Sequence, residues 1–284
     1  MTPMESTTRT RELGIALRGI REDADLTGDE LAKMLGWSPS KVSRLEHGKR
    51  LPSEVDIALY VASCGVLREK LEEVLELARA TDRGYWVRPH NERLPDELHS
   101  LTVQENIATA ISTYNPIFIP GLLQTKDYAD TLFRRAGLIP EDGIDLRVHT
   151  RMRRQRVLAK YDAPRFVCCI HEHALRTMVG GPEVMHGQIM RLLEVFESSN
   201  CQVWVLPRSA NSFSAVGSGF RVMSYTDHRP VAYEDTRAAG VFFDMPGDVA
   251  MYRQVFTKVT KEALTGEQSR QWLARLANEY DRME

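Results

Sequence analysis

The stretch LTGDELAKMLGWSPSKVSRLEHGKR, residues 26–50, decides the expected fold of the first part of the chain. In this stretch Thr27 is followed three residues later by Glu30, which is the pattern of a capping box at the start of a helix. Leu26 and Leu31 occupy the positions of a hydrophobic staple, which sets the direction in which the chain enters that helix. These residues predict a helix that starts directly after Thr27 and extends to residue 35.

The end of this helix and the start of the next lie close together. Gly36 tolerates the left-handed backbone conformation in which many helices end. Ser38 is a favourable N-cap, and Pro39 is favourable in the first turn of a helix. Two short helices separated by about three residues, one of them a glycine, are typical of a helix-turn-helix.

The second of these helices has two distinct faces. Val42 and Leu45 are expected to face inward, whereas Ser40 and Arg44 are four residues apart and therefore share one outward face. Positive charge is concentrated around this helix, which suits attraction to phosphates and the contact of arginine with guanine in the major groove. The positively charged side chains among residues 41–50 are Lys41, Arg44, Lys49 and Arg50.

Three segments of residues 17–52 resemble the Xre/lambda-repressor class of helix-turn-helix proteins. They are Leu17-Arg18-x-x-Arg21, Leu26-Thr27-x-x-Glu30-Leu31-Ala32 and Ser43-Arg44-Leu45-Glu46-x-Gly48-Lys49-Arg50-x-Pro52. The resemblance implies a buried ion pair between Arg21 and Glu46, which would connect the first helix to the end of the recognition helix. Gly28 departs from the family pattern, because relatives often carry there a glutamine that bonds the DNA backbone. That departure puts one phosphate contact in doubt.

The resemblance also implies which side chains contact DNA. Ser40 and Arg44 would contact base edges, joined by Lys41, while the others lie near phosphates. The full set of residues expected at the DNA is Thr27, Ser38, Ser40, Lys41, Ser43, Arg44, Lys49 and Arg50.

The overall charge of the chain gives no support to DNA binding. Its formal net charge is −2 at pH 7, whereas phosphate contacts supply much of the affinity of DNA-binding proteins. The alternative is a small helical bundle whose charged residues form a solvated face. The prediction of DNA binding therefore depends on the local placement of positive charge.

Composition indicates a cytoplasmic protein with two domains. A chain of 284 residues is longer than one small domain needs. No apolar run reaches the roughly 18 residues needed to span a bilayer, and residues 1–10 lack the apolar stretch of a secretory signal. The cysteines show no zinc-site spacing and are expected to be buried thiols, with no metal and no cofactor; they are Cys64, Cys168, Cys169 and Cys201.

The expected fold is α+β, with an all-α helix-turn-helix domain in residues 1–84 and a mixed α+β domain in residues 85–284. Gly84, Pro89 and Pro95 interrupt the helical pattern and place the boundary near residue 85. Helices and strands then intermix without strict alternation, which favours α+β over a doubly wound sheet. Helices are expected over 67–80, 101–114, 126–136, 145–160, 184–196, 248–264 and 267–283, and strands over 166–170, 202–206, 219–225, 230–233 and 241–244.

The second domain resembles the C-terminal part of actinobacterial Xre-type regulators of the WhiJ kind, which are sometimes described as antitoxin-like. The resemblance lies in Ile119-Pro120-Gly121-Leu122-Leu123-Gln124-Thr125 with Tyr128-Ala129, in Arg154-Gln155-x-x-Leu158, in His173-Ala174-Leu175-Arg176 and in Gly180-Gly181-Pro182-x-x-Met185. In that family the regulator gene often neighbours the gene for a short BldB-like protein. The resemblance therefore implies a regulatory protein partner and no reaction.

The second domain also carries side chains that invite a chemical interpretation. His171 and His173 could ligate a metal from one face of a strand, but no third ligand is evident, and a pair of strand-end histidines is the simpler interpretation. Ser224, Asp227 and His228 lack the nucleophile elbow of a hydrolase. We therefore expect no enzymatic activity.

The basic segment 147–160 is the remaining candidate site of the second domain. Its positive charge could bind an acidic partner, or it could form a solvated face with ion pairs to acidic helices. The candidate partner-binding residues are Arg151, Arg153 and Arg154.

The sequence thus predicts a dimeric transcriptional regulator that binds a palindromic operator and is modulated through its second domain by a BldB-like partner. The alternative is a regulator whose second domain senses a small molecule. An enzyme tethered to DNA is the third interpretation, and it rests on His171 and His173 alone.

Overall fold

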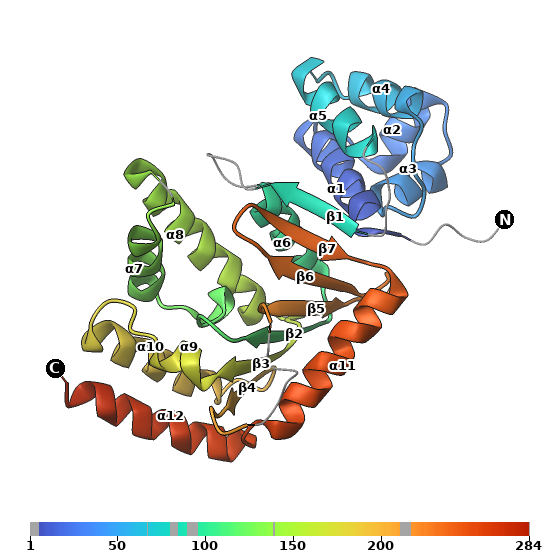
Figure 1. The fold of residues 1–284 in the computed structure, drawn as a ribbon. Coiled ribbons are helices and arrows are strands. Elements are labelled where there is room, and N and C mark those ends of the chain that lie inside the picture. Colours follow the sequence, from blue (N-terminus) through green and yellow to red (C-terminus); the bar gives the residue numbers. More distant parts are fainter. Residues whose placement is uncertain are drawn as a thin grey trace. The chain divides into compact units, whose positions relative to one another are not determined.

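The computed structural model of the chain describes residues 6–66, 68–79, 85–89, 96–138, 140–210 and 217–283. The chain divides into two compact units, Met1–Trp86 with Asp227–Arg229, and Val87–Thr226 with Pro230–Glu284. The predicted domain boundary at residue 84 lies outside the described residues. Figure 1 shows the first unit as a cluster of helices and the second as a mixed sheet with helices. The α+β fold is therefore confirmed.

The first unit is built from short helices around one apolar core. Leu17, Leu31, Ile57 and Tyr60 are completely buried in that core, and Val42 is 1% exposed. These residues come from four different helices, so the four helices pack around a single core. The helices are α1 (Thr8–Asp23), α2 (Gly28–Leu35), α3 (Pro39–Glu46), α4 (Glu54–Ser63) and α5 (Arg68–Arg79).

The local signals that define α2 and α3 act as predicted. The Thr27 side chain accepts a hydrogen bond from the Glu30 backbone, and the Glu30 side chain accepts one from the Thr27 backbone. Gly36 ends α2 with φ at +64°. The Ser38 hydroxyl accepts from the backbone N–H of Lys41 at 3.2 Å and so caps α3. The predicted helix-turn-helix is confirmed.

A seven-stranded mixed sheet has the order β1-β7-β6-β5-β2-β3-β4, and all of it except Tyr85 and Trp86 of β1 belongs to the second unit. Strands β2, β3 and β4 are parallel, whereas β5 pairs antiparallel with both β2 and β6, and β6 pairs antiparallel with β7. The strands are β1 (Tyr85–Pro89), β2 (Ala110–Asn115), β3 (Arg165–His171), β4 (Cys201–Leu206), β5 (Phe220–Ser224), β6 (Val231–Asp235) and β7 (Ala239–Phe243).

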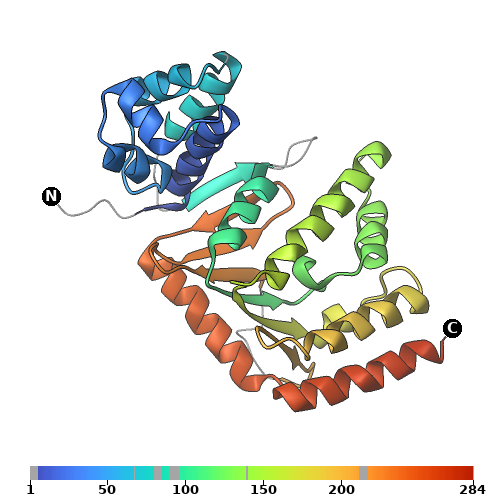
Figure 2. The ribbon, with the colours of Figure 1, turned by 180° about the vertical axis from the view of Figure 1, so that it is seen from behind.

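Helices cover both faces of this sheet. Helix α11 lies along one side and α7 and α8 along the other, as both views show (Figures 1 and 2). Tyr114 and Phe220 form a register pair on the face that packs against Val249 and Tyr252 of α11. The helical segments are α6 (Asp96–Ile107), η1 (Gly121–Leu123), α7 (Lys126–Ala136), α8 (Glu141–Gln155), η2 (Arg156–Ala159), α9 (Glu172–Arg176), α10 (Pro182–Val195), α11 (Pro246–Glu262) and α12 (Gly266–Asp281).

The outer edge of β4 is occupied by the chain that leads into α12. The backbone N–H of Val205 donates to the Ser269 hydroxyl at 3.0 Å. The backbone N–H of Leu264 donates to the Val205 carbonyl at 2.9 Å. Ser269 is completely buried. The polar groups that an edge strand would otherwise expose at this position are therefore satisfied within the chain.

Three predictions for the chain after residue 84 differ from the structure, one of them in its bounds and its last turn. The helix expected over 101–114 ends at Ile107, and its last part is instead the strand β2. The helix expected over 145–160 begins at Glu141, after Pro140, and becomes a 3-10 helix at Arg156. Residues 85–89, expected to be irregular, form the strand β1.

Candidate nucleic-acid interface

Helix α3 presents a polar outer surface on a buried base. Val42 and Leu45 are each 1% exposed, so the helix is anchored in the core of the first unit. Ser40, Ser43 and Arg44 are exposed. The guanidinium of Arg44 donates from Nε to the Ser40 carbonyl at 3.2 Å, which leaves its other nitrogens facing outward for a further contact.

The remaining residues expected at phosphates surround α3. Lys49 and Arg50 are exposed in the turn that follows it. Thr27 and Ser38 are exposed as well, but their side chains serve as N-caps of α2 and α3. Their backbone positions at two helix starts suit a phosphate contact, because helix N-termini carry partial positive charge.

Lys41 does not lie with the exposed set. Its ammonium forms an ion pair with Asp56 at 2.7 Å and lies 3.5 Å from the centre of the Trp37 ring. The side chain is 20% exposed. These contacts direct Lys41 toward α4, which corrects the expectation that it points outward beside Ser40. A base contact from Lys41 would require this ion pair to break.

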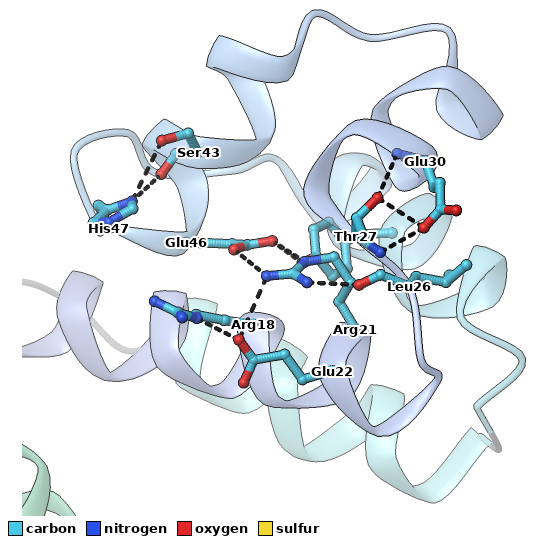
Figure 3. A network of polar contacts seen from close by, with 10 residues as sticks. Arg18, Arg21, Glu22, Leu26, Thr27, Glu30, Ser43, Glu46 and His47 are labelled. Carbon is cyan, nitrogen blue, oxygen red and sulfur yellow. Dashed lines mark hydrogen bonds and ion pairs between the residues drawn. The ribbon is translucent and has the colours of Figure 1, made fainter.

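The C-terminal end of α3 is held by the pair Arg21 and Glu46 (Figure 3). Arg21 donates from Nε and Nη2 to the two carboxylate oxygens of Glu46 at 2.7 and 2.9 Å. Its Nη1 donates to the Leu26 carbonyl at 2.7 Å, and the Tyr60 hydroxyl donates to Glu46 Oε1 at 2.6 Å. One guanidinium therefore connects α1, the loop before α2 and the end of α3.

The pKa values in this network follow from burial and hydrogen bonding. Burial by itself would raise the pKa of Glu46, but the hydrogen bonds from Arg21 and Tyr60 outweigh it and leave the pKa below its usual value. Burial, reinforced by the neighbouring Glu46 carboxylate, raises the pKa of Tyr60. The pair is therefore ionised at neutral pH, and Tyr60 remains a hydrogen-bond donor.

Two glycines allow α1 and the end of α3 to approach closely. A Cβ atom on Gly14 would lie 2.4 Å from the Glu46 carbonyl oxygen, and one on Gly48 would lie 2.6 Å from the carbonyl oxygen of Thr10. Gly48 also has φ at +63°, a conformation that favours glycine. The position of the recognition helix on α1 thus depends on the absence of these side chains.

Sequence reasoning missed several residues that support the site. Tyr60 completes the shell of Glu46, and Asp56 with Trp37 holds Lys41. His47 caps the end of α3, with its Nδ1 2.7 Å from the Ser43 carbonyl oxygen. The role of Tyr60 could have been predicted from the sequence, because a tyrosine within an apolar helix face needs a hydrogen-bond partner for its hydroxyl.

The three arginines proposed for partner binding in the second unit do not share one surface. Arg153 is exposed and Arg151 is partly buried. Arg154 is 7% exposed and forms an ion pair with the fully buried Glu105. The proposal of one docking surface that includes Arg154 was therefore wrong, because that side chain faces the interior.

The histidine pair is also arranged differently from the expectation. Strand β3 ends at His171, and His173 lies in α9, so the two do not share a strand face. The backbone N–H of His173 donates to Nδ1 of His171 at 3.0 Å, which makes His171 the N-cap of α9. Within the described parts of the chain, no cluster of three or more His, Cys, Asp or Glu side chains could hold a metal ion. Ser224, which the sequence groups with Asp227 and His228, accepts a hydrogen bond from Arg253 at 3.0 Å.

The described helices include none that is long and apolar enough to cross a bilayer. Comparison with curated proteins gave no match. One solved structure with partial likeness is that of TrmBL2, described as an archaeal chromatin protein with a novel mode of DNA binding. The alignment covers 84% of this chain and 88% of that chain, with 10% sequence identity and a TM-score of 0.31. A TM-score at that level carries no argument about fold or function.

Family models match both units. A model described as a helix-turn-helix domain matches residues 12–74, and these residues include α2, α3 and the exposed residues of the candidate interface. This match supports a DNA-binding regulator. A model described as domain of unknown function DUF5753 matches residues 98–275, which is more than half of the chain. The protein therefore belongs to the DUF5753 family and carries a helix-turn-helix domain ahead of the domain that defines the family.

Proposed function

We propose that the protein is a sequence-specific transcriptional regulator that inserts α3 into the major groove of an operator. Ser40 and Arg44 read base edges, and Ser43, Lys49 and Arg50 bind the flanking phosphates. The protein binds as a homodimer, so the operator is a palindrome.

The observation that supports this proposal best is the combination of a rigid anchor and an exposed surface on one helix. The Arg21 guanidinium and the Tyr60 hydroxyl fix the end of α3, while Ser40, Ser43 and Arg44 remain exposed. A buried ion pair at this position keeps the orientation of the helix constant, which base readout requires because hydrogen bonds to base edges are directional.

Selection of bound duplexes from a random double-stranded DNA pool tests the proposal. We expect enrichment of a two-fold symmetric motif whose half-sites lie about one helical turn apart, roughly 10–10.5 base pairs or a multiple. Footprinting on the enriched sequence should protect both half-sites. A pool that shows no sequence enrichment, with binding that disappears at moderate salt, would show that the contact with DNA is only electrostatic.

The second unit, on this proposal, modulates DNA binding by holding a short BldB-like protein and acts by binding, with no catalytic step. The support is the resemblance of its motifs to WhiJ-like regulators. With Arg154 buried, Arg153 is the member of the proposed set that can reach a partner freely.

Calorimetry between the protein and the product of a neighbouring BldB-like gene tests the partner. Arg153→Glu should weaken the association and reduce the extent to which added salt weakens it, because an attractive charge contact is lost. Arg270→Glu is the matched control, because Arg270 is also exposed but lies on α12. Equal affinity of the two variants would show that Arg153 takes no part in the contact.

A further inference from the structure

Three arginines of the second unit lie close to one another, and two of them contact one buried carboxylate. Glu105 of α6 is completely buried, and its Oε2 lies 2.8 Å from Nε of Arg154 on α8. Its Oε1 accepts from Nη1 of Arg221 on β5 at 2.6 Å. The side chains of Arg154 and Arg221 are only 4% and 13% exposed. Glu105 thus holds two guanidiniums at the face of the sheet.

Arg151 is the third arginine and lies one turn before Arg154 on the same face of α8. Its Nη1 donates to Oε1 of Gln124 at 2.6 Å, and its guanidinium lies 4.4 Å from the centre of the Phe133 ring. No carboxylate of the described residues forms an ion pair with it. Arg151 is partly buried, so it links the buried cluster to solvent.

The two arginines of α8 meet at Gly121. A Cβ atom on Gly121 would lie 3.2 Å from Nη2 of Arg154 and 3.4 Å from Nε of Arg151. The glycine therefore allows both guanidiniums to occupy one small region. Gln155 fixes the same loop by donating to the carbonyls of Gly121 and Gln124, both at 2.8 Å. On the side of Gly121, the contacts of Arg151 and of the loop are therefore made by neutral amides.

The charge of this region is unbalanced. Among the described residues Glu105 contacts two of the three guanidiniums, and the charge of Asp235 at the end of β6 offsets part of their mutual repulsion. Burial lowers the pKa of Arg151, and the neighbouring Arg154 and Arg221 lower it further. Like charges held together in a poorly solvated place are costly unless an anion joins them. Such a cluster is a candidate functional site.

We propose that Arg151 and Arg154, supported by Arg221, form a binding site for the phosphate group of a small ligand beside Gly121. A guanidinium presents its donors as a planar fork that matches phosphate oxygens. A carboxylate can be satisfied by one such fork, whereas a phosphate offers three acceptor oxygens to two forks that converge. This site goes beyond the DNA-binding proposal and does not depend on it.

Inorganic phosphate is the probe, added to the full-length protein while thermal unfolding is followed. We expect phosphate to raise the melting temperature of the wild type in a saturable way, whereas chloride at equal ionic strength does not. Arg151→Gln should weaken the phosphate affinity by about tenfold or more, as expected for the loss of a charge-assisted contact. Arg153→Gln is the matched control, because it removes the same charge from an exposed position on the same helix and should leave the affinity unchanged.

The outcomes separate the possible explanations. A wild type that phosphate does not stabilise, or an equal loss in Arg151→Gln and Arg153→Gln, would overturn the site. Stabilisation by acetate but not by phosphate would overturn the assigned ligand chemistry. If Arg151→Gln fails to fold, Arg151→Lys takes its place, because it retains the charge without the planar fork of the guanidinium. This variant should still bind phosphate less tightly than the wild type. Equal affinity would overturn the proposal. Operator binding by Arg151→Gln, measured without phosphate, should match the wild type, so a failure of the DNA proposal is seen separately.

Discussion

Two arginines of the first unit show how surroundings decide the role of one residue type. Arg21 is 8% exposed, and both oxygens of Glu46 and the Leu26 carbonyl accept its hydrogen bonds. Arg44 is exposed, and within the described residues its side chain hydrogen-bonds only to the backbone of its own helix. The guanidinium of Arg21 therefore stabilises the fold, whereas that of Arg44 has hydrogen-bond donors available for a partner. Their replacements should therefore have different effects.

Arg44→Ala should abolish operator specificity without unfolding the protein. One good contact with a base is worth about 1–3 kcal/mol of discrimination, and among the described residues the Arg44 side chain hydrogen-bonds to no other element. Fluorescence anisotropy with specific and scrambled duplexes gives the specificity ratio. Lys49→Ala is the comparison, since loss of a phosphate contact should weaken binding to both duplexes alike. An unchanged specificity ratio in Arg44→Ala would mean that another element reads the bases.

Glu46→Gln should destabilise the first unit by about 3–5 kcal/mol at neutral pH, because it strands the buried charge of Arg21. The pKa of Glu46 is lowered in the folded protein from 4.5, so its contribution is fully present above that value and is lost as pH falls through the folded pKa. Hydrogen exchange of α1 and α3 amides between pH 6 and 3 measures this. The difference between wild type and variant should shrink as the pH decreases. A difference independent of pH would contradict the ionised pair.

At the scale of elements, the contact between α1 and α3 depends on backbone proximity. Gly14 and Gly19 lie in the same helix, and replacing either by alanine raises helix propensity. They differ in their surroundings, since a Cβ on Gly14 meets backbone atoms of Leu45 and Glu46 whereas a Cβ on Gly19 meets nothing within 4 Å. Alanine substitutions at the two positions therefore distinguish the effect of helix propensity on stability from the effect of packing.

Gly19→Ala should stabilise the first unit by roughly 0.5–1 kcal/mol. Gly14→Ala should destabilise it despite the same gain, because carbonyl oxygens of a helix end cannot move aside as a flexible side chain can. Chemical denaturation of each variant gives the sign of its change in the free energy of unfolding. Hydrogen exchange within α3 then shows whether that helix is affected. Stabilisation by both substitutions would show that α3 can shift along α1 at little cost.

Elements with strong local signals were predicted well, and elements decided by distant contacts were not. The caps at Thr27 and Ser38 act within three residues of themselves, so the sequence around them is sufficient. Strand β2 continues the apolar pattern of α6, and only its pairing with β3 and β5 makes it a strand. Those partners are distant in sequence, and no local pattern reveals them.

The basic helix α8 shows a different limit. From the sequence alone, its positive residues are grouped into one candidate surface, although helical spacing separates them. Arg151 and Arg154 are three residues apart and continue the stripe of the buried Ile144 and Val148, whereas Arg153 points away from it. The 3.6-residue period could have assigned the first two to the interior. Their partner Glu105 could not have been found, because it belongs to another helix.

At the scale of the whole molecule, each unit has a core of its own. Leu17 and Tyr60 belong to the first core, and Tyr114 and Phe220 to the second. The proposed DNA contacts all lie in the first unit, and the proposed phosphate site lies in the second.

Ser269→Ala tests how strongly α12 is joined to the sheet. The substitution leaves the backbone N–H of Val205 without its partner in a buried place, which should cost about 1–3 kcal/mol. Thermal unfolding measures the loss. Ser198→Ala is the control, because its hydroxyl is exposed and its partners include the nearby Asn200 and Cys201, and it should change stability by less than about 0.5 kcal/mol. Equal effects would show that water replaces the lost hydrogen bond.

The order of synthesis gives this contact a further meaning. Ser269 follows Val205 by 64 residues, so the ribosome completes β4 well before the residues that close its edge exist. During that interval a nascent chain presents an open strand, and open strands recruit one another. Neighbouring chains on one messenger would be exposed to this risk together. Slow translation between residues 206 and 264 should therefore favour co-translational aggregation, and rapid translation should reduce it.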